Sequence, residues 1–161
     1  MKTRKIGTLT VSEVGMGCMA FSHGYGQIPS EQYSIEAIQY AYDHGCTFFD
    51  TAEIYSPNLS GTGHNERIVG KALQSVRKNV VLATKLFLNS SEVRRDGSVY
   101  GAIRRHLEVS IERLKTDTVD LYYLHRAGGG IYIEDIADAM GRLISEGLIG
   151  GWGLSQVDVD I

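Results

Sequence analysis

The sequence predicts an α/β fold built on a parallel sheet whose strands are covered on both faces. Two observations lead to this prediction. Apolar runs without clean alternation recur along the chain, which is typical of strands that are buried on both faces. Segments with a helical period of apolar residues lie between these runs. The five predicted strands are Glu13–Cys18, Thr47–Asp50, Val80–Lys85, Val119–His125 and Leu148–Leu154.

Four helices are predicted between and after these strands. Ser30, which follows Pro29, caps the first helix, and Gly45 ends it. The second helix begins near Asn65, and the fourth ends at Gly147. The apolar faces comprise Ile35, Ile38, Ala41 and Tyr42 in the first helix, Ile68, Val69, Ala72, Leu73 and Val76 in the second, Val99, Ile103, Leu107, Ile111 and Leu114 in the third, and Ile136, Met140, Leu143 and Ile144 in the fourth.

Two architectures fit such units: an open doubly wound sheet and a (β/α)8 (TIM) barrel. The segment Gly15-Met-Gly17 opens a loop rather than the helix that a dinucleotide-binding Gly-x-Gly-x-x-Gly fingerprint requires. Polar residues at successive strand ends also favour the barrel, because barrel enzymes carry their active sites at that rim. We therefore predict a partial (β/α)8 barrel. Residues 1–161 would hold its first five β/α units, as the N-terminal part of a single domain.

Composition restricts the classes of partner. The chain has 161 residues, of which 43% are hydrophobic and 22% charged, and this suits one soluble globular domain. A net charge of −3 gives no reason to expect nucleic acid or an anionic membrane as a partner. The sequence contains neither a secretory signal nor an apolar run near the ~20 residues that span a bilayer. Two isolated cysteines, Cys18 and Cys46, predict a cytoplasmic protein without a zinc cluster.

Four polar residues stand at or just after the ends of predicted strands. Asp50, Lys85 and His125 close the second, third and fourth strands, and Tyr55 follows Asp50 in the next loop. Because the carboxyl ends of parallel strands share one rim, the four side chains can meet there and form a proton-transfer site. Taken singly, each residue has a simpler explanation, such as a capping Asp or a packing Tyr. Their common placement favours catalysis.

Several segments resemble the aldo-keto reductase family, and their order and spacing are together highly specific. They are Gly15-Met-Gly-Cys-Met, Phe48-Phe-Asp-Thr-Ala-Glu-Ile-Tyr55, Asn65-Glu66 with Val69-Gly70 and Ala72-Leu73, Ala83-Thr-Lys85, Asp120-Leu-Tyr-Tyr-Leu-His-Arg126 and Trp152-Gly-Leu-Ser155. The segments Ser22-His-Gly-Tyr-Gly26 and His125-Arg126 are most similar to the general bacterial and plant-type branch. The resemblance implies an oxidoreductase that uses NADPH to reduce small aldehydes and ketones to alcohols.

The resemblance also implies roles for the residues at the rim. Asp50, Tyr55, Lys85 and His125 match the family's catalytic tetrad. Tyr55 would protonate the carbonyl oxygen, and His125 would orient it. The pKa of a free phenol is about 10. Lys85, held by Asp50, is therefore expected to stabilise the phenolate and lower that pKa.

The expected cofactor contacts are less specific. They involve Met16, Gly17, Asp50, Ser155 and Gln156. Ser155 would hydrogen-bond the nicotinamide carboxamide, and the alternative is that it caps a helix. Met16 and Gly17 would approach the nicotinamide ribose through backbone atoms, and the alternative is that they form a tight exit from the strand. Glu53 and Glu66 are expected to make structural contacts below the rim. Phe21, His23 and Tyr25 are expected to shape the substrate mouth.

The sequence departs from the family pattern in length. A complete barrel takes about 250 residues, and the segments that hold the adenosine 2′-phosphate and the pyrophosphate lie beyond the fifth strand in the family. We therefore expect either a missing C-terminal half or a homo-oligomer. The alternative functions are a non-catalytic, NADP(H)-sensing regulatory protein and an inactive fragment.

Overall fold

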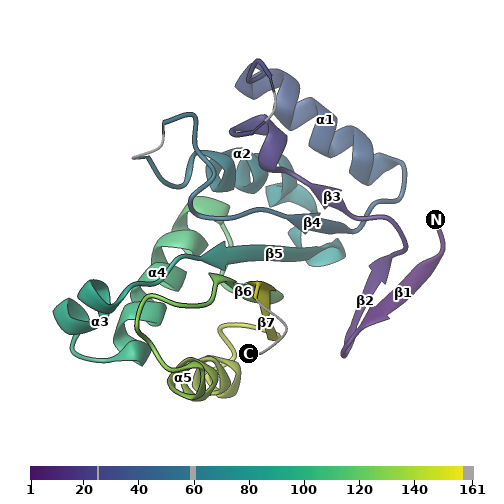
Figure 1. The fold of residues 1–161 in the computed structure, drawn as a ribbon. Coiled ribbons are helices and arrows are strands. Elements are labelled where there is room, and N and C mark those ends of the chain that lie inside the picture. The colour runs from purple at the N-terminus through teal and green to yellow at the C-terminus, as the bar shows by residue number, and fades with distance from the viewer. Residues whose placement is uncertain (25, 59–60, 158–161) are drawn as a thin grey trace.

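A parallel sheet of five strands forms the centre of the molecule (Figure 1). The computed structural model describes residues 1–24, 26–58 and 61–157. The strands are β3 (Met16–Gly17), β4 (Phe48–Asp50), β5 (Val81–Leu86), β6 (Leu121–Arg126) and β7 (Trp152–Gln156). They lie in sequence order, and every neighbouring pair is parallel. The predicted α/β fold, a partial (β/α)8 barrel, is thereby confirmed.

Four helices connect the strands or follow them, as predicted. They are α1 (Glu31–Asp43), α2 (His64–Leu73), α4 (Val99–Leu114) and α5 (Ile133–Ser145). Figure 1 shows α1 and α2 on one flank of the sheet and α5 on the other. The side chain of Ser30 accepts a hydrogen bond from the Tyr33 amide, so it caps α1 as expected. Val76 lies in the 3₁₀ helix η2 (Gln74–Asn79), because α2 ends earlier than its apolar pattern suggested.

Besides η2, a hairpin of two strands and two short helices lie outside the predicted pattern. Strands β1 (Thr3–Ile6) and β2 (Leu9–Ser12) form an antiparallel hairpin. Every residue of β1 is exposed, so the sequence has no apolar alternation that would reveal the strand. The helix α3 (Ser90–Asp96) begins with a capping box between Asn89 and Glu92. The 3₁₀ helix η1 (Met19–Phe21) follows β3.

The two edge strands differ most from their predicted bounds. The first strand was expected over Glu13–Cys18 but is confined to β3, and the fifth was expected over Leu148–Leu154 but is β7. Before β7, Ile149 makes only an isolated bridge to Val119. Gly150 lies so close to Asp120 that an added Cβ would stand 2.7 Å from the Asp120 carbonyl oxygen. The chain therefore crosses close to β6 before it pairs as a regular strand.

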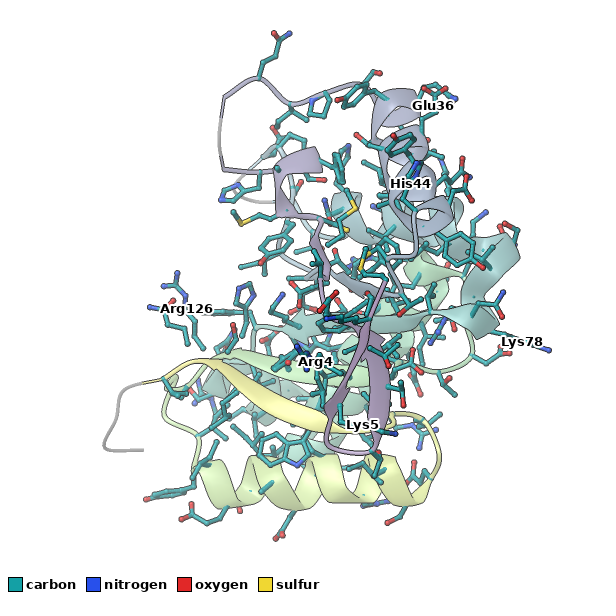
Figure 2. All side chains as sticks on the ribbon, turned by 90° about the vertical axis from the view of Figure 1, so that its right-hand side faces the viewer. Arg4, Lys5, Glu36, His44, Lys78 and Arg126 are labelled. Atoms are coloured by element: carbon teal, nitrogen blue, oxygen red, sulfur yellow. The ribbon has the colours of Figure 1, made fainter. Side chains whose placement is uncertain are left out.

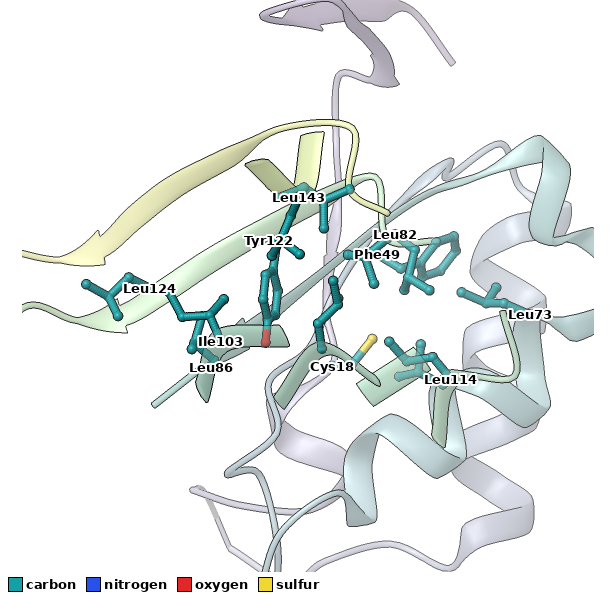
Figure 3. Close-up of a cluster of buried hydrophobic side chains, with 14 of the residues drawn as sticks. Cys18, Phe49, Leu73, Leu82, Leu86, Ile103, Leu114, Tyr122, Leu124 and Leu143 are labelled. Atoms are coloured by element: carbon teal, nitrogen blue, oxygen red, sulfur yellow. The ribbon is translucent and has the colours of Figure 1, made fainter. Parts of the chain in front are cut away.

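The hydrophobic core fills the space between the sheet and its helices (Figure 3). Phe49, Leu82 and Tyr122 contribute fully buried side chains from three successive strands. Burying a side chain of this size contributes about 1.5–3 kcal/mol. At Gly70, α2 approaches α4 so closely that an added Cβ would stand 2.6 Å from the Arg113 carbonyl oxygen. Within the described ranges, every helix is too short or too polar to cross a membrane.

Candidate active site

The site is built at the carboxyl ends of β4, β5 and β6. The sheet register places each predicted residue two positions beyond the partner of the one before it. Asp50 pairs with Ala83, two residues before Lys85 in β5. Lys85 in turn pairs with Tyr123, two residues before His125 in β6. Strand β5 ends one residue after Lys85, and β6 ends one residue after His125. Figure 2 shows Arg126, which ends β6, projecting from this rim.

The loop after β4 stays at the rim because it continues to bond to β5. The Thr51 amide donates to the Ala83 carbonyl oxygen at 2.9 Å, and the Glu53 amide donates to the Lys85 carbonyl oxygen at 3.1 Å. Tyr55 follows in the same loop, and its carbonyl oxygen accepts a hydrogen bond from the Asn65 amide at 3.1 Å. Backbone pairing and the start of α2 therefore hold the phenol close to Lys85.

The ammonium group of Lys85 is buried and satisfied by two acceptors. It forms an ion pair with Asp50 and donates to the Thr51 carbonyl oxygen at 2.8 Å. Alternation along β5 directs the preceding residue, Thr84, to the helical face, where its hydroxyl donates to Glu66 at 2.7 Å. A buried ammonium is tolerated only when it is paired, so Asp50 fixes the position of Lys85.

Tyr55 lies over Lys85 and beside His125. The Lys85 Nζ atom is 5.3 Å from the centroid of the Tyr55 ring. The Tyr55 and His125 ring centroids are 5.6 Å apart, with an interplanar angle of 85°. Burial raises the pKa of the Tyr55 phenol, and the negative charge of Asp50 raises it further. The overall rise is opposite to the lowering expected from Lys85, because burial of the phenol is the largest influence on its pKa.

The surroundings of His125 favour the neutral form of its imidazole ring. Burial lowers the pKa of its imidazole to about 4, and the positive charges of Lys85 and Arg126 act in the same direction. The ring is therefore neutral near pH 7. Its Nδ1 atom is buried and has no hydrogen-bond partner among the residues that the structure describes. A neutral imidazole of this kind can donate one hydrogen bond and accept another.

A pocket of about 380 Å³ opens directly over Tyr55 and His125. Its volume suits a small organic molecule. The first loop contributes His23, as predicted, whereas Phe21 is buried away from the pocket. Tyr25 lies outside the described residues. The lining residues are Met19, His23, Ile54, Tyr55, Ser56, Phe87, His125 and Arg126.

The predicted cofactor contacts fall into two groups. Met16, Gly17 and Asp50 line a second hollow of about 410 Å³ beside the β1–β2 hairpin. The position of a Cβ at Gly17 has no atom within 4 Å, so its backbone can be approached closely. Ser155 and Gln156 are exposed on β7. Because β3 and β7 are the two edges of the sheet, the structure does not bring these groups into one site.

The residues beneath the rim include several that the sequence pattern did not single out. Asn65 donates to the Cys18 carbonyl oxygen and to the Ser22 hydroxyl, both at 2.8 Å, and accepts from Thr51 at 2.6 Å. These bonds fix the first loop against the rim. His106 and Glu92 form a second network with Glu53. Only burial and contacts reveal it, because the sequence pattern of α4, which carries His106, marks amphipathicity alone, and α3, which carries Glu92, has no apolar pattern.

Comparison with known proteins agrees with this geometry. The sequence profile described as the aldo/keto reductase family matches residues 13–161. A probable aldo-keto reductase from Glycine max is 36% identical over 162 residues, which cover 97% of this chain and 45% of that protein. An aldo-keto reductase from Schizosaccharomyces pombe, named as acting with NADP(+), is 36% identical over 159 residues and covers 96% and 45%.

Solved structures show the same likeness. An aldo/keto reductase from Klebsiella pneumoniae, crystallised with NADP and acetate, matches with a TM-score of 0.76 and 32% identity, covering 94% of this chain and 48% of that one. The holo form of an aldo-keto reductase from Bacillus halodurans matches with a TM-score of 0.80 and 31% identity, covering 98% and 51%. The chain thus spans about half the length of these relatives. It belongs to the aldo/keto reductase family.

Proposed function

We propose that this chain carries the proton-transfer half of an NADPH-dependent reductase of small aldehydes and ketones. The observation that supports this most strongly is the pocket in which a protonated Tyr55 and a neutral His125 stand beside the Lys85–Asp50 ion pair. A carbonyl oxygen that enters the pocket would meet both polar groups.

The described residues fit the nicotinamide end of the cofactor better than its adenosine end. The hollow beside Asp50 and the open backbone at Gly17 would accept a flat polar ring. Met16 would contribute to the same wall, and Ser155 with Gln156 would reach the ring from β7 once the sheet closes into a barrel. The relatives from Klebsiella pneumoniae and Schizosaccharomyces pombe are described with NADP or NADP(+), which supports the choice of cofactor.

NADPH, when bound, supplies the hydride that forms the new C–H bond at the carbonyl carbon. As negative charge develops on the substrate oxygen, the Tyr55 hydroxyl gives that oxygen its proton. His125 donates a hydrogen bond to the same oxygen and orients it. Lys85, whose Nζ atom lies 5.3 Å from the Tyr55 ring centroid, then stabilises the phenolate that remains. The raised pKa keeps Tyr55 protonated until the oxygen becomes a stronger base.

We further propose that residues 1–161 form the N-terminal part of a single barrel domain. Strands β3 and β7 are edges in this sheet, whereas a barrel closes its sheet and has no edge. The rest of the barrel would come from a longer chain, and pairing with another copy is the alternative. Cys18 and Cys46 are buried free thiols, which suits a reducing cytoplasm.

Replacing Tyr55 with phenylalanine tests the proposed reaction. Tyr55→Phe should lower the rate of 4-nitrobenzaldehyde reduction by about 10²–10⁴-fold, because general acid catalysis is lost. NADPH affinity should change little, since the hydroxyl does not hold the dinucleotide. Tyr132→Phe is the matched control, because Tyr132 is 78% exposed and lies outside the pocket. Undiminished turnover in Tyr55→Phe would refute the assignment. Absence of turnover in the unmodified chain, with NADPH bound, would favour a sensing protein.

A further inference from the structure

Glu53 is the most completely bonded residue of the loop that carries Tyr55. One carboxylate oxygen accepts from the Phe87 amide at 2.6 Å, and the other lies 2.7 Å from His106 Nδ1. Its backbone amide donates to the Lys85 carbonyl oxygen at 3.1 Å, and its carbonyl oxygen accepts from the Gly63 amide at 2.6 Å. The side chain of Glu53 therefore ties the loop to the residue after β5 and to α4, while its backbone ties the loop to β5 and to the start of α2.

His106 provides the far end of this attachment. It lies in α4 and is only 9% exposed. Its Nε2 atom is 3.0 Å from a carboxylate oxygen of Glu92 in α3 and 3.2 Å from the Arg105 guanidinium. Arg105 itself is held by Asp96 at 2.8 Å. The imidazole thus stands between two carboxylates, with one guanidinium beside it, and α3 and α4 restrict its motion.

The bond between Glu53 and His106 exists in either protonation state of the imidazole. Burial lowers the pKa of His106, but its hydrogen bond to Glu53 and the charges of Glu53 and Glu92 outweigh burial and the opposing charge of Arg105, and they raise it overall. The charged ring donates to both carboxylates. A neutral ring can keep its proton on Nδ1, bonded to Glu53, while Nε2 accepts from Arg105.

Tyr55 has little else to hold it. Its neighbour Ile54 is 37% exposed, and Tyr55 itself is only half-buried. Besides the attachment of Glu53, the backbone bonds from the Tyr55 amide to Ala52, at 3.2 Å, and from the Asn65 amide to the Tyr55 carbonyl oxygen, at 3.1 Å, hold the loop. Apolar packing contributes little at the loop tip, so the buried polar attachment two residues before Tyr55 carries more of the positioning.

From these contacts we infer that Glu53 and His106 are positioning residues, which hold the Tyr55 phenol over Lys85 and beside His125. Neither residue lines the pocket over Tyr55. They act through the loop rather than on the substrate. The inference rests on the proposed function for its catalytic meaning, whereas the geometry that it assigns to Tyr55 can be measured without turnover.

Two substitutions of His106 separate the two bonds of its ring. In His106→Asn the amide nitrogen takes the place of Nδ1 and can still donate to Glu53. In His106→Gln it takes the place of Nε2, and the bond to Glu53 is lost. Glu92→Gln is the matched control, because it changes the other partner and leaves the bond to Glu53 in place. A role in stability alone would not separate the first two variants by which nitrogen they replace.

The direct readout is the contact between the Tyr55 and His125 rings, followed by NMR on protein with labelled aromatic side chains. The NMR signals of the Tyr55 ring are assigned as those that are lost from the tyrosine spectrum in Tyr55→Phe. We expect the cross-peak between the two rings to persist in the unmodified chain, in His106→Asn and in Glu92→Gln, and to disappear in His106→Gln. If His106→Gln does not fold, Glu53→Leu provides the same test, because it removes the carboxylate that His106 Nδ1 contacts.

Turnover provides a second readout. His106→Gln should lower kcat by up to about 10²-fold, as small displacements of a reacting group do, with KM nearly unchanged. His106→Asn should restore most of kcat. An intact ring contact in His106→Gln, or an equal loss in both His106 variants, would overturn the inference. An inactive unmodified chain with the expected ring contacts would count against the proposed function alone.

Discussion

The molecule uses two histidines in opposite ways on the two sides of the Tyr55 loop. His125 stands at the rim, where burial and the positive charges of Lys85 and Arg126 lower its pKa to about 4. His106 stands behind the loop, where Glu53 and Glu92 flank it and its pKa is raised. The same side chain is therefore a neutral hydrogen-bonding group in the pocket and a favoured cation in the supporting layer.

Hydrogen bonding separates the two sites as clearly as charge does. Both ring nitrogens of His106 have partners, whereas Nδ1 of His125 is buried without one in the described part of the chain. Buried polar groups are nearly always bonded, so a fully bonded group supports the fold, and an unpaired group beside a pocket marks where a ligand can bind. This contrast directs attention to His125 for chemistry and to His106 for position.

The largest expected effect comes from removing the charge that distinguishes the rim. Lys85→Met should reduce the rate of carbonyl reduction by about 10²-fold or more, because the phenolate loses its stabilising charge. The pKa of His125 should rise from about 4 towards its ordinary value, since Lys85 is one of the charges that depress it. Titration of the His125 ring by NMR measures this shift. An unchanged pKa would show that burial and Arg126 neutralise His125 without Lys85.

A smaller effect is expected in the dependence of stability on pH. The pKa of His125 lies below the ordinary 6.5, so its stabilising contribution is present above pH 6.5 and is lost as the pH falls towards about 4. After allowance for solvent screening at this half-buried site, the loss should be about 1 kcal/mol. The pKa of His106 is raised, so its contribution is complete below pH 6.5 and is lost as the pH rises through the folded-state value.

Urea unfolding at about pH 5 and about pH 8 measures both contributions. Relative to the unmodified chain, His125→Asn should reduce the loss of stability at the lower pH. His106→Asn should reduce the loss at the higher pH. Equal pH profiles for the two variants would remove the electrostatic contrast between the sites.

The smallest effect is expected at an ion pair that lacks burial. Lys71 lies 2.5 Å from Glu31 on the surface between α2 and α1, with both side chains about half exposed. Lys71→Met should leave the free energy of unfolding unchanged within the error of urea unfolding, because exposed ion pairs are screened by water. A clear destabilisation would mean that charge pairing, rather than burial, distinguishes the His106 network.

Much of the fold was predictable because both of its main signals are local. Continuous apolar runs identified the five strands of the sheet, and helical periodicity identified α1, α2, α4 and α5. The β1–β2 hairpin was not predicted because every residue of β1 is exposed, and α3 was not predicted because none of its seven residues is buried. Such elements are held by turns and capping bonds, which leave no apolar period in the sequence.

In the site, too, features that follow from local sequence pattern were predicted, and features that depend on tertiary contacts were not. Placement at strand ends was enough to predict that Asp50, Lys85 and His125 would converge, because register follows from parallel pairing. The pKa of Tyr55 was predicted in the wrong direction, since it depends most on how deeply the phenol is buried, which strand-end placement does not show. The attachment of Glu53 to His106 joins residues 53 positions apart. No local pattern encodes such a contact.

The close approach of α2 to α4 at Gly70 has a consequence for how this chain can diverge. Any side chain at position 70 would meet the backbone of Arg113 and Leu114, and a backbone cannot rotate aside as a side chain can. Lys71, the next residue along, faces solvent and can vary freely. We therefore expect related sequences to keep glycine at this helix crossing while the adjacent surface drifts. An insertion or a larger residue there would have to be accompanied by a shift of the whole α2 helix.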